Sequence, residues 1–218
     1  MRALTNMVYS FLKRLLDIAI ALSALILLSP VFVVIAFLIK LDSKGPVIAD
    51  IPPRVGKNGK LFKMYKFRSM VAGAHDLLHN DPKFKTLLEE YQRNSYKINE
   101  DPRVTHIGRF LRKTSLDELP QFINVIKGDM SFVGHRAYYD FELEEQQKKF
   151  PESREYVKII LSSKPGITGL WQVSGRSNIN FDKRVEMDAQ YAQRRSILYD
   201  LWIIIKTIPA VLTTRGAV

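Results

Sequence analysis

No cysteine occurs among the 218 residues of the chain. This absence excludes disulfide bonds, metal sites built on thiolates and catalysis by a cysteine nucleophile. Internal repeats and low-complexity tracts are absent too. Acidic residues are few relative to basic ones: 22 Asp and Glu stand against 33 Lys and Arg, and the net charge is +11. Such an excess suits an anionic membrane surface, a nucleic acid or a phosphorylated substrate, with a solvated basic surface as the plainer alternative.

Charge is absent altogether from one stretch near the N-terminus, the 22 residues 18–39. As a straight helix this stretch would measure about 33 Å, enough to cross the hydrocarbon core of a bilayer. An ordinary transmembrane helix and a buried core helix are the alternatives to consider. Few soluble helices are apolar on every face over such a length, so the pattern favours a membrane segment.

Two features of this stretch favour a re-entrant segment over a true span. Ser29-Pro30 lies near its middle, and proline kinks a helix because it removes a backbone hydrogen bond. Loops rich in Lys and Arg prefer the cytoplasmic side of a membrane, and both flanks are basic. We therefore predict that residues 1–45 enter and leave the membrane by the same face, with the break at Ser29-Pro30. The basic flanking residues are Lys13, Arg14, Lys40 and Lys44.

Residues 46–218 are predicted to form one globular domain, because their number suits a single core. Asn58-Gly59 between two partly apolar runs predicts a β-hairpin, and the run 61–70 that follows could be a strand. The apolar segment Ile197–Leu212 predicts a helix that either packs on the core or lies in the membrane plane. Other local signals predict an acidic helix over residues 141–150, a turn over 164–169 and a helix over 178–193.

A run of ten residues, RKTSLDELPQ, sets the adjacent carboxylates Asp117 and Glu118 beside basic side chains. Ser115 followed by Glu118 matches a helix capping box, and apolar residues recur at helical spacing up to Gly128, a plausible helix stop. Pro120 prefers a first turn, which leaves a helix start near residue 119 as the alternative. A helix N-terminus stabilises an ionised carboxylate and a docked phosphate. Two interpretations of the pair follow. It is a plain helix cap, or it has a catalytic role as a nucleophile or a metal ligand.

Four motifs follow one another in a distinctive order, at residues 65–70, 112–121, 124–130 and 165–169. Together with the re-entrant type of segment and the hairpin, this order of motifs resembles the bacterial sugar transferases that are monotopic phosphoglycosyl transferases. The resemblance covers nearly the whole chain. No large membrane domain precedes the core, so we expect a short member. The resemblance implies an α+β fold: a mostly helical, membrane-associated globular domain with a small β-hairpin, anchored by an N-terminal re-entrant membrane helix.

The resemblance also implies a reaction, the transfer of a sugar-1-phosphate from a UDP-sugar to polyprenyl (undecaprenyl) phosphate with release of UMP. This step initiates exopolysaccharide, O-antigen or glycoprotein-glycan assembly. By the same resemblance, Asp117 is the nucleophile of a covalent aspartyl–phosphosugar intermediate, and Glu118 helps to bind Mg²⁺ or the incoming phosphate. The implied location is the bacterial inner membrane, with residues 46–218 as a catalytic domain on the cytoplasmic face. The wording of residues 169–177 favours a hexose, galactose or glucose, and a homodimer is left open.

A carboxylate that attacks a phosphodiester needs the negative charge of its target neutralised by a divalent cation and by basic side chains. Mg²⁺ prefers oxygen ligands, so Asp117 and Glu118 are the candidate metal ligands. The candidate residues that bind the phosphates and the nucleotide sugar are Lys66, Arg68, Arg112, Arg136, Gln172 and Arg176.

Two positions depart from the family. The Gln expected shortly before Arg54 is absent, and Ile51-Pro52-Pro53 stands there; the usual Gly-Pro-Arg-Pro is Gly134-His-Arg-Ala in this chain. We expect His135 to be a loop residue rather than a metal ligand, and Arg136 to be less rigidly held than usual. Two other classes stay open, a catalytically inactive membrane scaffold and a membrane-anchored nucleic-acid-binding protein. The basic residues are spread along the chain without a recognised binding fold, so no nucleic acid is expected as a partner. The Asp117-Glu118 pair argues against the scaffold.

Overall fold

The computed structural model describes residues 2–93, 98, 100–175 and 179–212. Within these residues the fold is α+β and mostly helical, with one small antiparallel hairpin, as expected. The α-helices are α1 (Arg2–Leu27), α2 (Ser29–Asp42), α3 (Ala74–Asn80), α4 (Lys85–Arg93), α5 (His106–Thr114), α6 (Gln121–Lys127), α7 (Asp140–Lys149), α8 (Ser153–Leu161), α9 (Leu170–Ser174), α10 (Phe181–Arg194) and α11 (Ile197–Leu212). The strands are β1 (Arg54–Val55), β2 (Leu61–Phe62), β3 (Ser131–Val133) and β4 (Gly166–Thr168), and the 3-10 turns are η1 (Lys57–Gly59), η2 (Pro82–Phe84) and η3 (Leu116–Glu118).

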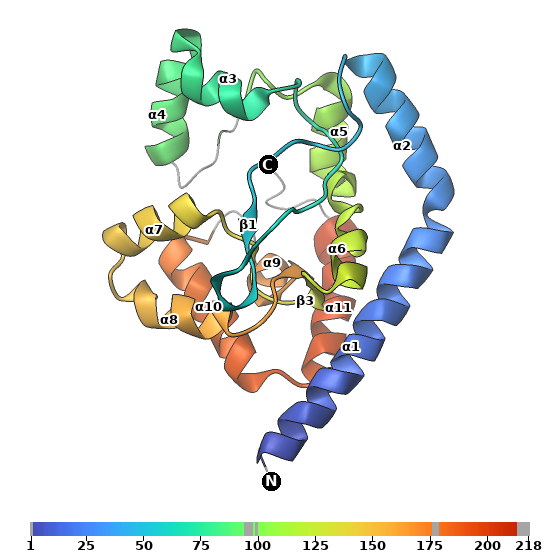
Figure 1. Cartoon of the computed structure of the whole chain (residues 1–218), viewed down its shortest axis with the longest axis vertical. Coiled ribbons are helices and arrows are strands. Elements are labelled where there is room, and N and C mark those ends of the chain that lie inside the picture. Colours follow the sequence, from blue (N-terminus) through green and yellow to red (C-terminus); the bar gives the residue numbers. More distant parts are fainter. Residues whose placement is uncertain (1, 94–97, 99, 176–178, 213–218) are drawn as a thin grey trace.

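Helices α1 and α2 run along one side of the molecule and are bent by 62° where they meet (Figure 1). The break falls at Leu28, one residue before the predicted Ser29-Pro30. Pro30 lies in the first turn of α2, where its missing N–H costs no hydrogen bond, and the Ser29 hydroxyl donates to the carbonyl of Ile26 at 2.8 Å. No single helix among the described residues is long and apolar enough to cross a membrane, but this bent pair together meets that test.

The first half of α1 is anchored in the globular body by polar contacts. The Asp17 carboxylate is buried and accepts hydrogen bonds from the Ser131 hydroxyl at 2.7 Å and the Phe132 N–H at 3.0 Å. The Arg14 guanidinium donates to the carbonyls of Val125 and Ile126 at 2.6 and 2.7 Å, at the C-terminal end of α6. The globular body therefore forms around the start of the apolar segment, while both helices beyond it expose large apolar side chains. These are Leu22, Ile26, Leu27, Val33, Val34, Phe37 and Leu41.

The Asn58-Gly59 signal is confirmed, because β1 and β2 pair antiparallel across η1. Asn58 and Gly59 adopt φ angles of 58° and 77°, the left-handed conformations that these residue types tolerate best. The strand that could have continued to residue 70 ends at Phe62. Beyond it the chain stays extended and makes single bridges, such as the one from Phe67 to Ile48.

The turn predicted over residues 164–169 is wrong, because Gly166–Thr168 is strand β4, paired in parallel with β3. A Cβ atom on Gly166 would lie 2.1 Å from the backbone nitrogen of Gly134, so only glycine allows this close approach. Pairing with a strand about thirty-five residues upstream is not visible in a local pattern. Helices α1, α6 and α11 contact this strand pair, whereas α8 and α10 pack on each other in a core cluster that includes Tyr138, Ile160 and Val185.

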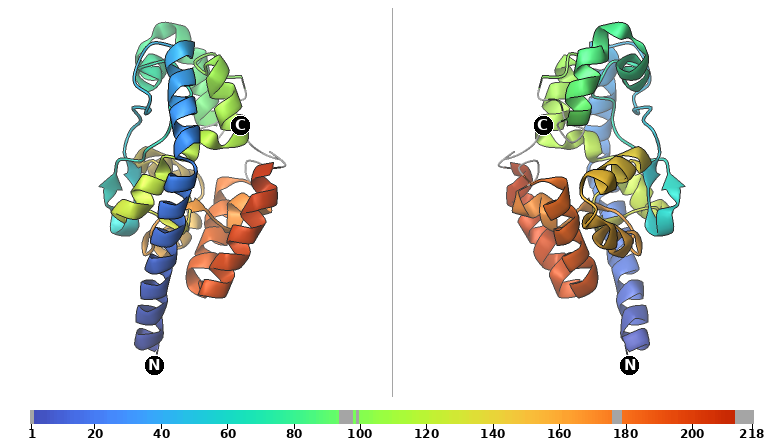
Figure 2. Two further views of the ribbon diagram at one scale, coloured as in Figure 1. Left: turned by 90° about the vertical axis from the view of Figure 1, so that its right-hand side faces the viewer. Right: turned by 90° about the vertical axis from the view of Figure 1, so that its left-hand side faces the viewer.

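The helix predicted over Ile197–Leu212 is confirmed as α11. Its Ile203 is fully buried, whereas Leu198, Ile205 and Ile208 are exposed. One face therefore packs on the body and the opposite face stays apolar and uncovered. Viewed along its edge, the molecule carries the β1–β2 hairpin and the α10–α11 pair on opposite sides (Figure 2).

Candidate active site

The Asp-Glu pair lies in a tight turn between α5 and α6, and the predicted capping box is wrong. Ser115 takes a left-handed conformation (φ 58°) that ends α5, and its side chain caps no helix. Asp117 and Glu118 belong to η3, and α6 begins only at Gln121, close to the alternative start near residue 119. Gly128 ends α6 with a φ of 88°, as predicted.

Lys66 lies between the two carboxylates. Its Nζ is 3.3 Å from Asp117 Oδ2 and 2.8 Å from Glu118 Oε1. The neighbouring Phe67 N–H donates to the Asp117 carbonyl at 2.9 Å, which ties the turn to the extended segment after β2. Asp117 is buried, whereas the Glu118 side chain is 37% exposed. The site thus offers one sheltered carboxylate and one that faces solvent.

The protonation of this trio follows from its burial. Burial raises the pKa of Asp117, against the lowering effect of Lys66, while Glu118 adds to the rise. Burial alone would lower the pKa of Lys66, but the two carboxylates outweigh it and raise that pKa. Lys66 is therefore held charged, and its charge opposes the rise in the pKa of Asp117.

Three arginines surround the trio. Arg112, in the last turn of α5, is close enough to act on the pKa of Asp117, after burial, Lys66 and Glu118. Burial would lower the pKa of Arg136, but Glu142, Tyr138 and Glu118 outweigh it and raise that pKa. The third is Arg54, to which sequence reasoning assigned no role.

Arg54 is a buried cation of strand β1. Its guanidinium carbon lies 3.3 Å from the centre of the Tyr139 ring, and its Nη1 donates to the Ala137 carbonyl at 3.1 Å. Burial lowers the pKa of Arg54, and the nearby Arg136 cation acts in the same direction. A signal existed in the sequence, namely an arginine at the start of the hairpin, but its partner Tyr139 is 85 positions away.

Asp188 of α10 holds the loop that carries Arg136. The Arg136 N–H donates to Asp188 Oδ2 at 3.1 Å, and the Arg136 side chain lies 5.7 Å from the Trp171 ring. His135 is buried, with its ring nitrogens 2.7 and 3.3 Å from the carbonyl oxygens of Arg136 and Ser163. The expectation of a loop residue is wrong, because His135 forms a parallel bridge with Pro165 that continues the β3–β4 pairing. These contacts hold the backbone next to Arg136 without the two prolines.

The remaining predicted residues lie in different places. Gln172 is in α9 beside Trp171, and its Oε1 is buried without a hydrogen-bond partner in the described structure. Arg176 lies outside the described residues. Arg68 is not brought to the carboxylates: its guanidinium donates to the carbonyls of Lys44 and Ser43 at 2.7 Å each, at the end of α2. Arg68 therefore holds the bent helix pair to the body.

A metal ion at this site would find two carboxylates. Among the described residues, no group of three or more His, Asp or Glu side chains could hold a metal by itself. Mg²⁺ commonly binds through one or two carboxylates and completes its shell with substrate phosphates and water. Asp117 and Glu118 fit that mode as far as their number and chemistry go, and they do not fit a closed protein cage.

Comparison with known proteins agrees with this arrangement of residues. Residues 8–214 match the family described as bacterial sugar transferase. The exopolysaccharide production protein ExoY of Sinorhizobium fredii is 43% identical over 205 residues, which are 94% of this chain and 87% of that protein. The undecaprenyl-phosphate galactose phosphotransferase of Salmonella typhimurium is 44% identical over 211 residues, which are 95% of this chain and 42% of that protein.

A third relative is the UDP-glucose:undecaprenyl-phosphate glucose-1-phosphate transferase of Escherichia coli, 41% identical over 202 residues, or 90% of this chain and 39% of that protein. The chain spans most of the ExoY relative but less than half the length of the other two. The matched range covers almost all of the sequence, and the positions of the trio and its arginines lie within it. The chain is a member of the bacterial sugar transferase family.

Proposed function

We propose that this protein transfers a sugar-1-phosphate from a UDP-sugar to polyprenyl phosphate and releases UMP. The observation that carries the proposal is the buried Asp117 carboxylate, paired with Lys66 and surrounded by arginines. Two of the relatives are named for sugar-phosphate transfer to undecaprenyl phosphate, one for galactose and one for glucose. We therefore propose UDP-galactose or UDP-glucose as the donor.

The reaction proceeds in two displacements at one phosphorus atom. An Asp117 carboxylate oxygen attacks the sugar-bearing phosphorus of the UDP-sugar, and the bond from that phosphorus to the bridging oxygen breaks, so UMP leaves with the electron pair. A phosphate oxygen of the polyprenyl phosphate then attacks the same phosphorus and expels Asp117. The products are a polyprenyl diphosphosugar and the free carboxylate, so atoms and charge balance without an oxidant or reductant.

The basic residues stabilise the negative charge that develops in these steps. The Lys66 cation opposes the rise that burial causes in the pKa of Asp117, and it can stabilise the negative charge that passes to the phosphate when the carboxylate becomes an acyl phosphate. Arg54 and Arg136 are held by Tyr139, Trp171 and the Asp188 carboxylate before substrate arrives. Such preorganised cations stabilise phosphate charge without reorganisation during the reaction.

Mg²⁺ is part of the proposal. When bound, it would neutralise the diphosphate of the donor and stabilise the departing UMP. Glu118 is the residue we assign to hold it, because its side chain is the more exposed of the two carboxylates. The ion pair between Glu118 and Lys66 would then yield to the metal, while Lys66 keeps its contact with Asp117.

We further propose that the bent pair α1–α2 is re-entrant and places the site on the cytoplasmic face of the inner membrane. Support comes from the 62° bend and from the large apolar side chains that both helices expose. The exposed face of α11, with Trp202 at 45% exposure, would lie in the membrane interface. A polyprenyl phosphate has its phosphate at that level, so the second displacement needs no extraction of the lipid.

The test uses the full chain in detergent with Mg²⁺, undecaprenyl phosphate and a panel of UDP-sugars, with UMP release as the readout. Given a UDP-hexose without the lipid, the wild-type protein should gain the mass of a hexose phosphate. Asp117→Asn should lose both the adduct and turnover, while Glu144→Gln, an exposed carboxylate paired only with Lys148, should keep both. Failure of every UDP-sugar to release UMP, or full activity in Asp117→Asn, would overturn the proposal.

A further inference from the structure

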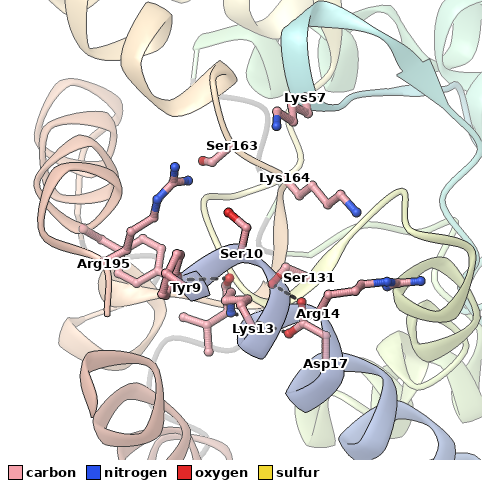
Figure 3. Close-up of a pocket in the computed structure, with 12 residues that line it drawn as sticks. Tyr9, Ser10, Lys13, Arg14, Asp17, Lys57, Ser131, Ser163, Lys164 and Arg195 are labelled. Atoms are coloured by element: carbon pink, nitrogen blue, oxygen red, sulfur yellow. Dashed lines mark hydrogen bonds and ion pairs between the residues drawn. The ribbon is translucent and has the colours of Figure 1, made fainter. Parts of the chain in front are cut away.

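A cavity of about 210 Å³ lies between α1, η1, the loop before β4 and the link from α10 to α11 (Figure 3). None of the residues assigned to the reaction lines it. Five basic residues and one carboxylate do, and the pocket is therefore strongly cationic: they are Lys13, Arg14, Lys57, Lys164, Arg195 and Asp17.

Two of these cations have structural partners. Lys13 Nζ lies 3.5 Å from the Asp17 carboxylate and 3.2 Å from that of Asp200. Arg14 donates to two carbonyls at the end of α6, Val125 and Ile126. Neither interaction neutralises the remaining side of the cavity.

The other three cations have no carboxylate of the described residues in direct contact. In the ranges that the structure describes, Lys57, Lys164 and Arg195 form no ion pair. They come from three separate segments and surround an open space (Figure 3). Arg195 is held in place over the Tyr9 ring, with its guanidinium carbon 5.6 Å from the ring centre. Five cations against the single carboxylate of Asp17 leave a net positive charge around the cavity, which favours an anion there.

The Lys164 cation lies close to the Arg14 cation. Both cations approach Gly128 at the end of α6. A Cβ atom built on Gly128 would lie 3.4 Å from Lys164 Nζ and 3.6 Å from Arg14 Nη2. Burial lowers the pKa of Lys164, and the nearby Arg14 cation acts in the same direction. A bound anion would act in the opposite direction and raise the pKa of Lys164 again.

We propose that this cavity binds a phosphate group, carried either by a membrane phospholipid or by a soluble phosphate. The volume suits one phosphate and its ester carbon rather than a peptide. Lysine and arginine side chains match phosphate oxygens, and the hydroxyl-bearing residues Ser10 and Ser163 also line the cavity. The apolar stretch of α1 begins at Ile18, directly after the lining residue Asp17, so the cavity adjoins the end of the proposed membrane segment. The site is independent of the reaction proposed above.

The soluble source is tested with the full chain in detergent, by titration calorimetry with inorganic phosphate against chloride at equal ionic strength. The double variant Lys164→Gln/Arg195→Gln removes two cations that have no ion-pair partner, and it should weaken phosphate binding by about tenfold or more, given about 1 kcal/mol per basic residue. Lys83→Gln/Lys85→Gln removes the same charge from exposed positions near α4 and should leave affinity within about twofold of wild type. Arg136→Ala changes the candidate active site but not the cavity, so this variant should also retain phosphate binding.

The lipid source is tested by native mass spectrometry after purification in the presence of phosphatidylglycerol. Wild type should retain a phosphatidylglycerol molecule that Lys164→Gln/Arg195→Gln loses. Should that double variant fold poorly, Lys57→Gln and its matched control Lys60→Gln, both exposed in or beside η1, provide the same comparison, since only Lys57 lines the cavity.

Loss of binding in the cavity variants, with either probe, supports the proposal and identifies the source. Equal binding of both probes by wild type and by the folded cavity variants would overturn it. Phosphate binding that disappears in Arg136→Ala but persists in Lys164→Gln/Arg195→Gln would also overturn it, because the anion would then occupy the active site alone.

Discussion

Two lysines of this protein each lie between two carboxylates, and they serve opposite purposes. Lys66 contacts Asp117 and Glu118 in the candidate active site, at 3.3 and 2.8 Å. Lys13 contacts Asp17 and Asp200 where α1 meets the body, at 3.5 and 3.2 Å. The distances alone do not distinguish a catalytic site from a structural one.

The other partners of the carboxylates make the difference. Asp200 is fully buried and also accepts hydrogen bonds from the Tyr9 and Tyr191 hydroxyls, while Asp17 accepts from Ser131 and Phe132. Within the described structure, the Asp117 side chain accepts one hydrogen bond, from Lys66. A carboxylate whose lone pairs are occupied stabilises the fold, whereas one with a single, exchangeable partner is available to attack a phosphorus atom.

The largest effect is expected where the structural pair is broken. Asp200→Ala removes both hydroxyl bonds and leaves Lys13 with one partner, so the free energy of unfolding should fall by about 3–5 kcal/mol. Turnover per folded molecule should stay near wild type, because Asp200 is remote from Asp117. Denaturant unfolding in detergent and UMP release, normalised to folded protein, measure the two quantities. A loss of turnover per folded molecule with unchanged stability would reverse the assignment.

Breaking the other pair should affect activity first. Lys66→Met should lower kcat/KM by roughly 100-fold, or about 2.7 kcal/mol of transition-state stabilisation. Without Lys66 the pKa of Asp117, already raised by burial, rises further, so the acid limb of the pH–rate profile should move to higher pH. Lys63→Met, an exposed lysine of the same segment, is the control and should leave the profile unchanged. An unshifted acid limb in Lys66→Met would show that Asp117 is not the titrating group.

Asp188 is an intermediate case, a buried carboxylate that accepts a hydrogen bond from the Arg136 backbone. Burial raises its pKa to about 8, so the folded state binds a proton that the unfolded state releases at lower pH. Stability should therefore fall as pH rises from about 4 to 8, by at most about 1.4 kcal/mol per pH unit. Asp188→Asn should flatten this slope, and Asp50→Asn, at an exposed position, should preserve it. Thermal unfolding across that pH range decides the matter.

The smallest effect concerns one of the bonds that saturate Asp17. Ser131→Ala removes the hydroxyl that donates at 2.7 Å, but Lys13 and the Phe132 N–H remain. The free energy of unfolding should fall by about 1–2 kcal/mol. Ser162→Ala, whose exposed hydroxyl only bonds its own helix, should change it by less than about 0.5 kcal/mol. Equal effects of the two variants would contradict the structural role of the Asp17 contacts.

Features set by local sequence were predictable. The break near Ser29-Pro30, the Asn58-Gly59 hairpin and the helix Ile197–Leu212 all rest on short-range rules of proline, turn and periodicity, and all are present. The capping box failed because Ser115 closes the preceding helix in a left-handed conformation instead of opening the next one. Strand β4 was missed because its partner is remote in sequence.

The candidate site follows the same division. Lys66, Arg112 and Arg136 are near the Asp117-Glu118 pair, as the motifs and the resemblance implied. Arg54 was missed because its place is set by stacking on a distant tyrosine. Arg68 lies only two residues from Lys66, yet its guanidinium is bound by carbonyls at the end of α2, a contact that no spacing rule reveals.

The contacts between α1 and β3 have a consequence for how the protein is made. Asp17 is synthesised before its hydrogen-bond partner Ser131, which is 114 positions further along the chain. At 5–20 residues per second, the ribosome needs roughly 6–23 s to supply that partner, and longer for Asp200. Throughout this interval the apolar N-terminal segment has been synthesised, while the body that anchors it has not. The contacts that hold α1 to the body therefore form late in synthesis, well after α1 itself has been made.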